Sequence, residues 1–331
     1  MPRSPDSVEV PGARGSQLDL SERLERLPHG HPSSPYEADG SRKPPVAAPR
    51  ADDGPRDSSP HPEPFTDTEW AEHVTEVRDR LRQAHADGLA TDEQYTIDPH
   101  HEVWSETREA QHDALIHDLY QRAAGVPCEY RAFIAGGLPG AGKTTVLENY
   151  AGIDRSQFLT INPDDVKAEL VRRGLVPEVA GLSPMEASEL VHEESSHIAK
   201  RLAFRAQADG KNVIWDVTMS SLASTQRRIE DLRENRYTQI EGIFVDLPPE
   251  VSADRAAGRH RDGEEGYRAG EGDGGRFLPA ESILANTDPA WGSLNRKTFE
   301  QVKDSLDNWW VYDNSVDGRD PVLVESSATS K

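Results

Sequence analysis

The chain has 331 residues, of which 35% are hydrophobic, and it carries a formal net charge of −22. This length suffices for one large α/β domain with additional elements, while the acidic balance argues against a nucleic-acid-binding surface, which requires a basic stripe. No run of about 18 apolar residues and no apolar signal-peptide core occurs, and Cys128 is the only cysteine, which together predict a cytoplasmic protein without membrane segments or internal disulfides.

Residues 1–65 have the composition of a disordered tail. They contain 13 of the 24 prolines of the chain, and their longest apolar run is only Val46–Ala48. Such a segment cannot bury enough apolar surface to offset the entropy lost on ordering. A short amphipathic turn from about Leu18 to Leu27 is a candidate docking motif, although we favour a solvated tail.

Residues 66–128 predict two helices. The first is capped by Thr66 or Thr68, carries apolar residues at three- and four-residue spacing, and ends at Gly88. The second runs from about Ser105 to Ala124. We expect both helices to pack on the following nucleotide-binding domain as an N-terminal extension.

A short apolar strand, Ala132–Gly136, leads into a glycine-rich loop that is typical of nucleoside-triphosphate sites. The loop fills every position of the pattern G-x-x-x-x-G-K-[ST]. Its glycines permit positive φ and close approach to phosphates, and the helix that begins at about Lys143 directs its positive end at the same anion. In such sites the lysine contacts the β- and γ-phosphates and the hydroxyl of Thr144 ligates Mg²⁺. The predicted ATP-binding residues are Gly137, Leu138, Pro139, Gly140, Ala141, Gly142, Lys143, Thr144 and Thr145.

Acidic side chains stand at the ends of the next two predicted strands. The strand at 157–162 leads to Asp164 and Asp165, and the strand at 212–216 ends in Asp216, two residues before Thr218. Open α/β sheets bind ligands at the carboxyl ends of their strands. Asp216 therefore has the position of a magnesium-organising or substrate-holding residue. Asp164 is the candidate general base, with Asp165 as its alternative.

A long helix predicted from about Pro184 to Asp209 carries one acid on its apolar stripe. Glu194 lies four residues from both Leu190 and Ile198 and so shares their face. An acid on an apolar face lies either near a ligand or at the solvated end of the stripe. We favour the ligand.

Residues 251–279 combine five arginines with seven glycines after a strand that ends at Asp246. In an acidic protein this composition predicts a mobile lid, at about 255–279, that closes on phosphates. For Arg261 and Arg268 we favour a charged surface instead. Further along, Trp309–Ser315 is predicted to end a helix and enter a turn, with its tryptophans in the core, and Pro321–Val324 is predicted to be the last strand.

The order of these motifs resembles the zeta toxins, the kinase members of bacterial toxin–antitoxin pairs. The resemblance covers about residues 130–290 and rests on the phosphate loop followed by P-D-D-x-K, H-E-E-S-S, W-D-x-T and R-F-x-P. It implies a three-layer α/β P-loop kinase fold with a mostly parallel sheet over residues 129–331. It also implies transfer of the ATP γ-phosphoryl group to the 3′-hydroxyl of the sugar of UDP-N-acetylglucosamine, and a small antitoxin that covers the nucleotide site.

The resemblance further implies roles for individual residues. The catalytic residues are Asp164 as base, Lys143, and the lid arginines Arg259 and Arg276, while the substrate contacts are Glu194, Asp216 and Thr218. Asp216 is shorter than the glutamate expected there, and a substrate contact on the helix after Thr218 has no clear match. Two other functions stay open: a kinase of another small hydroxyl compound, such as an antibiotic or nucleoside, and a nucleotide-gated binding module without catalysis.

Overall fold

The computed structural model of the chain describes residues 63–327. All but the last three residues of the predicted disordered tail, together with the candidate docking turn from Leu18 to Leu27, lie outside the described residues. Within residues 63–327, no helix combines the length and the apolar character needed to cross a membrane.

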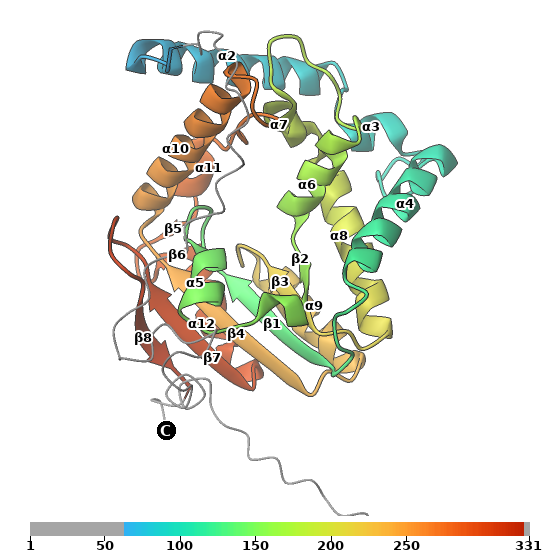
Figure 1. Cartoon of the computed structure of the whole chain (residues 1–331), viewed down its shortest axis with the longest axis vertical. Coiled ribbons are helices and arrows are strands. Elements are labelled where there is room, and N and C mark those ends of the chain that lie inside the picture. Colours follow the sequence, from blue (N-terminus) through green and yellow to red (C-terminus); the bar gives the residue numbers. More distant parts are fainter. Residues whose placement is uncertain (1–62, 328–331) are drawn as a thin grey trace, which may run out of the picture. The chain divides into compact units, whose positions relative to one another are not determined.

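A six-stranded sheet forms the centre of the described part of the chain (Figure 1). In spatial order its strands are β2 (Leu159–Ile161), β3 (Val213–Asp216), β1 (Arg131–Gly136), β4 (Gln239–Asp246), β7 (Asn308–Asp313) and β8 (Val322–Ser326). All neighbouring strands are parallel except β7 and β8, which are antiparallel. The predicted mostly parallel sheet is therefore confirmed, and the last predicted strand coincides with β8.

Helices cover both faces of the sheet, and Figure 1 shows α5 in front of it and α9 behind. The main helices are α5 (Lys143–Asn149), α6 (Pro163–Arg172), α8 (His192–Ala208), α9 (Leu222–Glu234), α10 (Pro249–Arg268) and α12 (Leu294–Val302). Because side chains alternate along a strand, Ala132 and Ile134 of β1 share one face. They join a buried core with Ile198 of α8, Ile229 of α9 and Phe299 of α12. The three-layer arrangement agrees with the prediction.

Two helix predictions differ from the structure. The helix expected from Pro184 to Asp209 is divided into α7 (Pro184–Ala187), the 3₁₀ turn η2 (Ser188–Val191) and α8. The segment expected to end a helix at Trp309 is strand β7, paired between β4 and β8. Periodicity does not distinguish a strand from a helix in so short an apolar run, and pairing with two strands decides it. Trp309 and Trp310 are buried in the core, as predicted. The remaining short elements are α3 (Thr91–Tyr95), η1 (Arg155–Gln157), α11 (Ala280–Leu284), β5 (Thr287–Asp288), β6 (Gly292–Ser293) and η3 (Lys303–Ser305).

The glycine-rich segment after β4 is also more regular than its composition predicts. Residues 249–268 form the continuous 20-residue helix α10 in place of a loop. At Gly263 a Cβ atom would lie 2.5 Å from the Cα atom of Gly275, so the absence of side chains allows the returning chain to pack directly on the helix. Close packing accounts for these two glycines, and Arg259 consequently stands on a helix.

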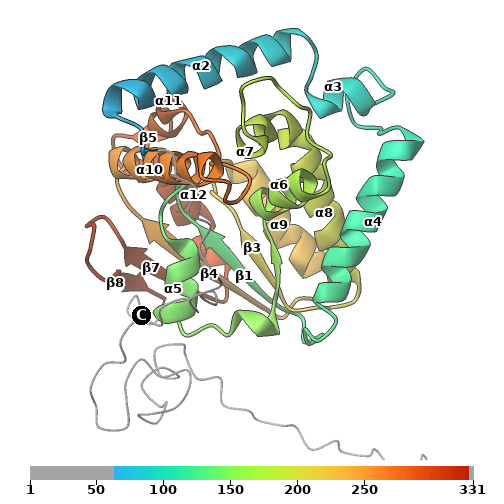
Figure 2. The same cartoon turned by 45° about the horizontal axis from the view of Figure 1, so that its top comes forward.

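The two predicted N-terminal helices are present as α2 (Asp67–Ala86) and α4 (Glu106–Arg122). Thr66 caps α2 in a capping box with Glu69. Figure 2 shows α2 extending from α10 and α11 towards α7 and α3. Its buried Leu81 belongs to a hydrophobic cluster with Leu190 of η2 and Phe277, the residue after Arg276. Helix α2 therefore packs against elements on both sides of the cavity that is described below.

Phe65, the last residue of the segment that we predicted to be disordered, packs against α2 and α10. The Phe65 ring lies 5.3 Å from Trp70 and 5.2 Å from His73, measured between centroids. The guanidinium of Arg268 lies 4.1 Å from the centre of the Phe65 ring, and Arg261 donates a hydrogen bond to the Phe65 carbonyl. Phe65 thus joins α2 to α10. The predicted tail, which was expected to include Phe65, therefore ends at least one residue earlier.

We predict that Phe65→Ala lowers the free energy of unfolding by about 1–2 kcal/mol, because a partly buried ring and a cation–π contact are lost. Urea denaturation of the full chain measures the change. Phe204→Ala is the matched control, since that ring is 72% exposed and its loss is expected to cost less than about 0.5 kcal/mol. Equal stability of the two variants would show that Phe65 is not docked.

Candidate functional site

The phosphate loop connects β1 to α5 and is built on strained backbone that suits glycine. Gly142 has φ 82° and caps α5. Gly137 has φ 138°, and a Cβ atom there would lie 2.4 Å from the carbonyl oxygen of Val245 on β4. The loop therefore lies directly against the neighbouring strand, with its backbone free to approach a phosphate.

Side chains from two other elements hold the loop in shape. Ser252 of α10 donates a hydrogen bond to the carbonyl of Pro139 (2.5 Å). Asn314, directly after β7, donates to the carbonyl of Ala141 (2.8 Å). Leu138 is buried with Ala253 of α10 in a small apolar cluster and anchors the loop from below. Loop and helix α10 thus form one packed unit.

A cavity of about 670 Å³ opens above this loop at the carboxyl ends of β1, β2 and β3. Most of the predicted site residues line it: Pro139, Gly140, Ala141, Gly142, Lys143, Thr144, Thr145, Asp164, Asp216, Thr218, Arg259 and Arg276. Gly137 and Leu138 are not among the lining residues, because they form the base of the loop. The volume lies within the usual range for small-molecule sites.

Lys143 and Asp216, which both line the cavity, form an ion pair. The Lys143 Nζ atom lies 3.5 Å from Asp216 Oδ1 and donates to the carbonyl of Gly137 (3.2 Å). Parallel pairing of β1 with β3 places Ala135 opposite Asp216, so the acid stands beside the start of the loop. The other Asp216 oxygen accepts a hydrogen bond from Asn162 (3.3 Å). The carboxylate is thus fixed from both sides.

Asp164 stands in the first turn of α6 and contacts Arg276. The Asn162 side chain caps this helix by accepting a hydrogen bond from the Asp164 amide (2.9 Å). Desolvation in the cavity acts to raise the pKa of Asp164, but the Arg276 guanidinium and two nearby lysines outweigh it and hold that pKa below its usual value. Desolvation and the negative charge of Asp216 both raise the pKa of Asp165 above its usual value. The two neighbouring acids therefore differ in character, with Asp164 the more acidic.

Two arginines face the cavity from the side of α10. Arg259 projects from the helix, and Arg276 comes from the returning segment that packs on it. Burial, and secondarily the charge of Arg276, lower the pKa of Arg259 from its ordinary value, although a guanidinium stays protonated throughout the physiological range. Together with Lys143, they place three cations around one space, as a polyphosphate site requires.

Glu194 is placed elsewhere, and the structure contradicts its expected contact with substrate. Its side chain is fully buried and does not line the cavity. Arg108 of α4 binds both carboxylate oxygens, at 2.6 and 2.8 Å, and His112 of α4 contacts one of them at 2.6 Å. The acid on the apolar stripe therefore neither contacts the cavity nor reaches solvent. It is neutralised by the N-terminal helix α4.

Several residues of the site were missed by the sequence analysis, namely Asn162, Ser252, Asn314 and Arg228. Asn162 and Arg228 line the cavity itself. A signal existed for two of them. Asn162 and Asn314 directly follow β2 and β7, and the strand-end rule that pointed to Asp164 and Asp216 applies to them equally.

A buried histidine cluster joins α2 to the helices that flank the cavity. Glu186 of α7 contacts His73 of α2 and His260 of α10 through the same oxygen, each at 2.8 Å. Its other oxygen accepts from the amide of Ser183 (3.0 Å). Burial alone would raise the pKa of Glu186, but the hydrogen bonds from His260 and His73 lower it to about 2. Because α10 carries Arg259, this cluster fixes the arginine-bearing side of the cavity to α7.

The sequence profile of the zeta toxin family matches residues 129–316. The chain belongs to the zeta toxin family. This confirms the resemblance and places the chain among kinase-like phosphotransferases.

The individual relatives of this zeta toxin family member are distant. The calmodulin calcium-dependent NAD kinase of Arabidopsis thaliana is 30% identical over 121 residues, which is 34% of this chain and 23% of that protein. The chain thus matches less than a quarter of the length of this curated relative. The crystal structure of AvrRxo1-ORF1:AvrRxo1-ORF2 with sulphate ions has a TM-score of 0.54 at 20% identity and covers 72% of this chain and 76% of that one. The same complex with ATP has a TM-score of 0.52 at equal identity and coverage. These structures support the P-loop kinase fold.

We predict a pH-dependent loss of stability for Glu186→Gln. A pKa of about 2, against an ordinary value of 4.5, corresponds to about 3 kcal/mol of stability, fully present above pH 4.5 and lost as the pH falls towards 2. The hydrogen bond to Glu186 raises the pKa of His73, against the opposing effect of burial. That contribution is complete below pH 6.5 and disappears as the pH rises through the raised value. Urea unfolding of parent and variant should therefore differ most between about pH 4.5 and 6.5, and a pH-independent difference would contradict the cluster.

We also predict that Lys143→Ala lowers ATP turnover by about 10²-fold or more, because this lysine is the one cation on the phosphate loop. Lys200→Ala, an exposed change on α8, is the control and should leave turnover unchanged. Nucleotide hydrolysis or transfer is followed by the release of ADP. Turnover of Lys143→Ala within a few-fold of the parent would refute the nucleotide site.

Proposed function

We propose that this zeta toxin family member transfers the γ-phosphoryl group of ATP to the 3′-hydroxyl of the sugar of UDP-N-acetylglucosamine. One observation carries the proposal. A single cavity combines a complete phosphate loop, four lysine and arginine side chains and the half-exposed carboxylate of Asp164. A binding module needs the loop and the cations, whereas a positioned carboxylate facing them suits an acceptor hydroxyl.

The charge pairs of the cavity define the proposed roles. Lys143 and Arg276 contact Asp216 and Asp164. Phosphates of ATP attract the same cations, and charge-assisted contacts to phosphate are strong. When Lys143 and Arg276 bind the nucleotide phosphates instead, the carboxylates of their two partners become available to hydroxyl groups of the acceptor. Asp164 then orients the reacting hydroxyl and accepts its proton, while Lys143, Arg259 and Arg276 offset the negative charge of the transferred group.

The cavity also has a donor set that suits Mg²⁺. The hydroxyl of Thr144 and the carboxylates of Asp165 and Asp216 line it together, and oxygen atoms are the ligands that Mg²⁺ prefers. We propose that Thr144 holds the ion, whose chemistry would be to neutralise the ATP phosphates.

The acceptor has a second candidate. The partial similarity to a protein named as an NAD kinase favours a ribose hydroxyl of NAD, a compound that shares with UDP-N-acetylglucosamine a diphosphate attached to sugars. Thr218 and Arg228 also line the cavity and are the proposed acceptor contacts, with Asp216. Family membership also leads us to propose a small antitoxin that covers the nucleotide site.

We predict that Asp164→Asn lowers acceptor phosphorylation by about 10²-fold, because the amide keeps the shape but accepts no proton. ATP affinity should be similar, since the phosphate loop is untouched. The full chain is incubated with ATP, Mg²⁺ and a panel that includes UDP-N-acetylglucosamine, NAD, nucleosides and aminoglycosides, and the products are weighed by mass spectrometry.

Asp165→Asn is the matched comparison, with the same change one residue away, and it should retain more activity than Asp164→Asn. Normal phosphorylation by Asp164→Asn together with loss in Asp165→Asn would move the base to Asp165. Loss of ATP binding in Asp164→Asn would make Asp164 a structural or magnesium-binding residue. Absence of any phosphorylated acceptor with the parent chain would refute the proposed function.

A further inference from the structure

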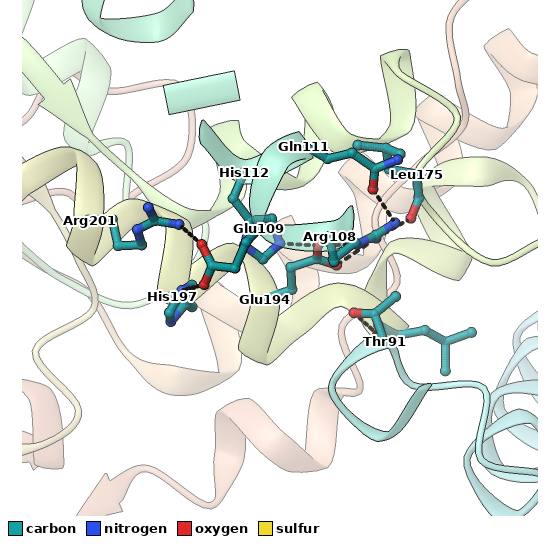
Figure 3. Close-up of polar contacts among 10 residues, drawn as sticks. Thr91, Arg108, Glu109, Gln111, His112, Leu175, Glu194, His197 and Arg201 are labelled. Atoms are coloured by element: carbon teal, nitrogen blue, oxygen red, sulfur yellow. Dashed lines mark hydrogen bonds and ion pairs between the residues drawn. The ribbon is translucent and has the colours of Figure 1, made fainter. Parts of the chain in front are cut away.

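A second group of titratable side chains lies outside the cavity, between α4 and α8. It consists of Glu109 and His112 on α4 and His197 on α8 (Figure 3). One ring nitrogen of each histidine and one carboxylate oxygen of Glu109 lie within 4.8 Å of one another. We call these three residues the α4–α8 cluster.

Two ring nitrogens of the cluster have no hydrogen-bond partner among the described residues. They are Nδ1 of His112 and Nε2 of His197, and both atoms are buried. The His112 side chain is only 1% exposed, and its Nε2 atom contacts Glu194 at 2.6 Å. A carboxylate only accepts hydrogen bonds, so Nε2 of His112 carries a proton, and Nδ1 is the ring nitrogen that is left without a partner. A buried polar atom without a partner is unfavourable unless something binds it.

An aromatic side chain covers one side of the cluster. Trp104 packs against both rings, with centroid distances of 4.9 Å to His112 and 5.7 Å to His197. This ring closes one side of the cluster with apolar surface.

The cluster also has the outer contacts that orient metal ligands. His112 is held through its other nitrogen by Glu194, which Arg108 neutralises, as Figure 3 shows. Glu109 contacts His197 with one oxygen, 3.6 Å from Nε2, and Arg201 with the other. Ligating histidines and carboxylates are typically oriented by such second contacts. The 3.6 Å separation is close to the ~3.3 Å between two ligands bound to tetrahedral zinc at about 2.0 Å.

The other histidine cluster of the protein differs in this respect. Around Glu186, the carboxylate oxygen already bonds both His73 and His260, and neither ring has a buried nitrogen without a partner among the described residues. Hydrogen bonding alone accounts for that cluster, and it does not account for the one between α4 and α8.

We propose that Glu109, His112 and His197 bind a divalent transition-metal ion, with Zn²⁺ as the ion that best suits the donor set. Two imidazoles and one carboxylate are a common zinc ligand set, with water in the fourth position. The three-residue spacing of Glu109 and His112 puts both on one face of α4, opposite His197. The bound ion would fasten the N-terminal helix α4 to α8, next to the contact between His112 and the buried Glu194. The proposal is independent of the acceptor and of catalysis.

The test uses the full chain, treated with a chelator, dialysed, and titrated with Zn²⁺ in the absence of nucleotide. One zinc per chain should bind, and at a concentration about 100-fold above the Kd the melting temperature should rise by about 5–10 °C. His197→Ala and Glu109→Gln should each weaken binding by at least about 10-fold. Both changes are at partly exposed side chains, so the variants should remain folded. His117→Ala, an exposed histidine on the same helix, is the control and should bind as the parent does.

Cobalt gives a second readout, because the visible absorption of Co²⁺ reports its coordination. A tetrahedral spectrum in the parent that is lost in His197→Ala would support the site. Three outcomes would overturn it: no stoichiometric zinc, equal binding in His197→Ala, or binding that is lost in His73→Ala instead. Equal binding in His197→Ala would place the metal on other residues, such as the histidines at positions 29, 31 and 61.

Discussion

Parallel pairing of β1 with β3, and of β3 with β2, brings three strand ends to one edge of the sheet, and the chemistry of the protein depends on this edge. It sets Asp216 beside the phosphate loop and Asn162 beside Asp216. The concentrated charge there is balanced internally, since Lys143 contacts Asp216 and Arg276 contacts Asp164. In the proposed function a polyphosphate competes for these cations, which would couple nucleotide binding to exposure of the carboxylates through charge.

The N-terminal helices belong to the same electrostatic system. Glu186 and Glu194 are both completely buried on the kinase side of the chain; Glu194 receives both its charged partner Arg108 and His112 from α4, and Glu186 receives His73 from α2 in addition to His260. Removing one partner of a buried ion pair typically costs about 3–5 kcal/mol. Residues 66–128 therefore contribute to the neutralisation of two acids that the following domain buries. The His73–Glu186–His260 contacts also extend this dependence to α10, the helix that carries Arg259.

Features that depend on residues adjacent in the chain could be predicted from the sequence. The phosphate loop and the strand-end acids Asp164 and Asp216 are each encoded within a few positions, and the structure brings them to one cavity. Contacts between distant residues were not predictable in this way. Glu194 was expected near a ligand because the local sequence shows no partner for it. Its partner, Arg108, stands 86 positions earlier in the chain. The glycines of α10 suggested a loop, but Gly263 instead lets the returning chain at Gly275 pack on the helix, a contact between residues that no local pattern shows. Likewise, only pairing with β4 and β8 makes the Trp309 segment a strand.

The most direct measurement of the central claim is the fate of the γ-phosphoryl group of ATP. The full chain is supplied with ATP labelled in that group, together with Mg²⁺ and UDP-N-acetylglucosamine, and the products are separated and located by mass spectrometry and phosphorus NMR. Our account predicts label on the 3′-oxygen of the sugar and an equal amount of ADP. Label found only in inorganic phosphate, whichever acceptor is offered, would contradict a kinase and leave a nucleotide hydrolase or binding module in its place.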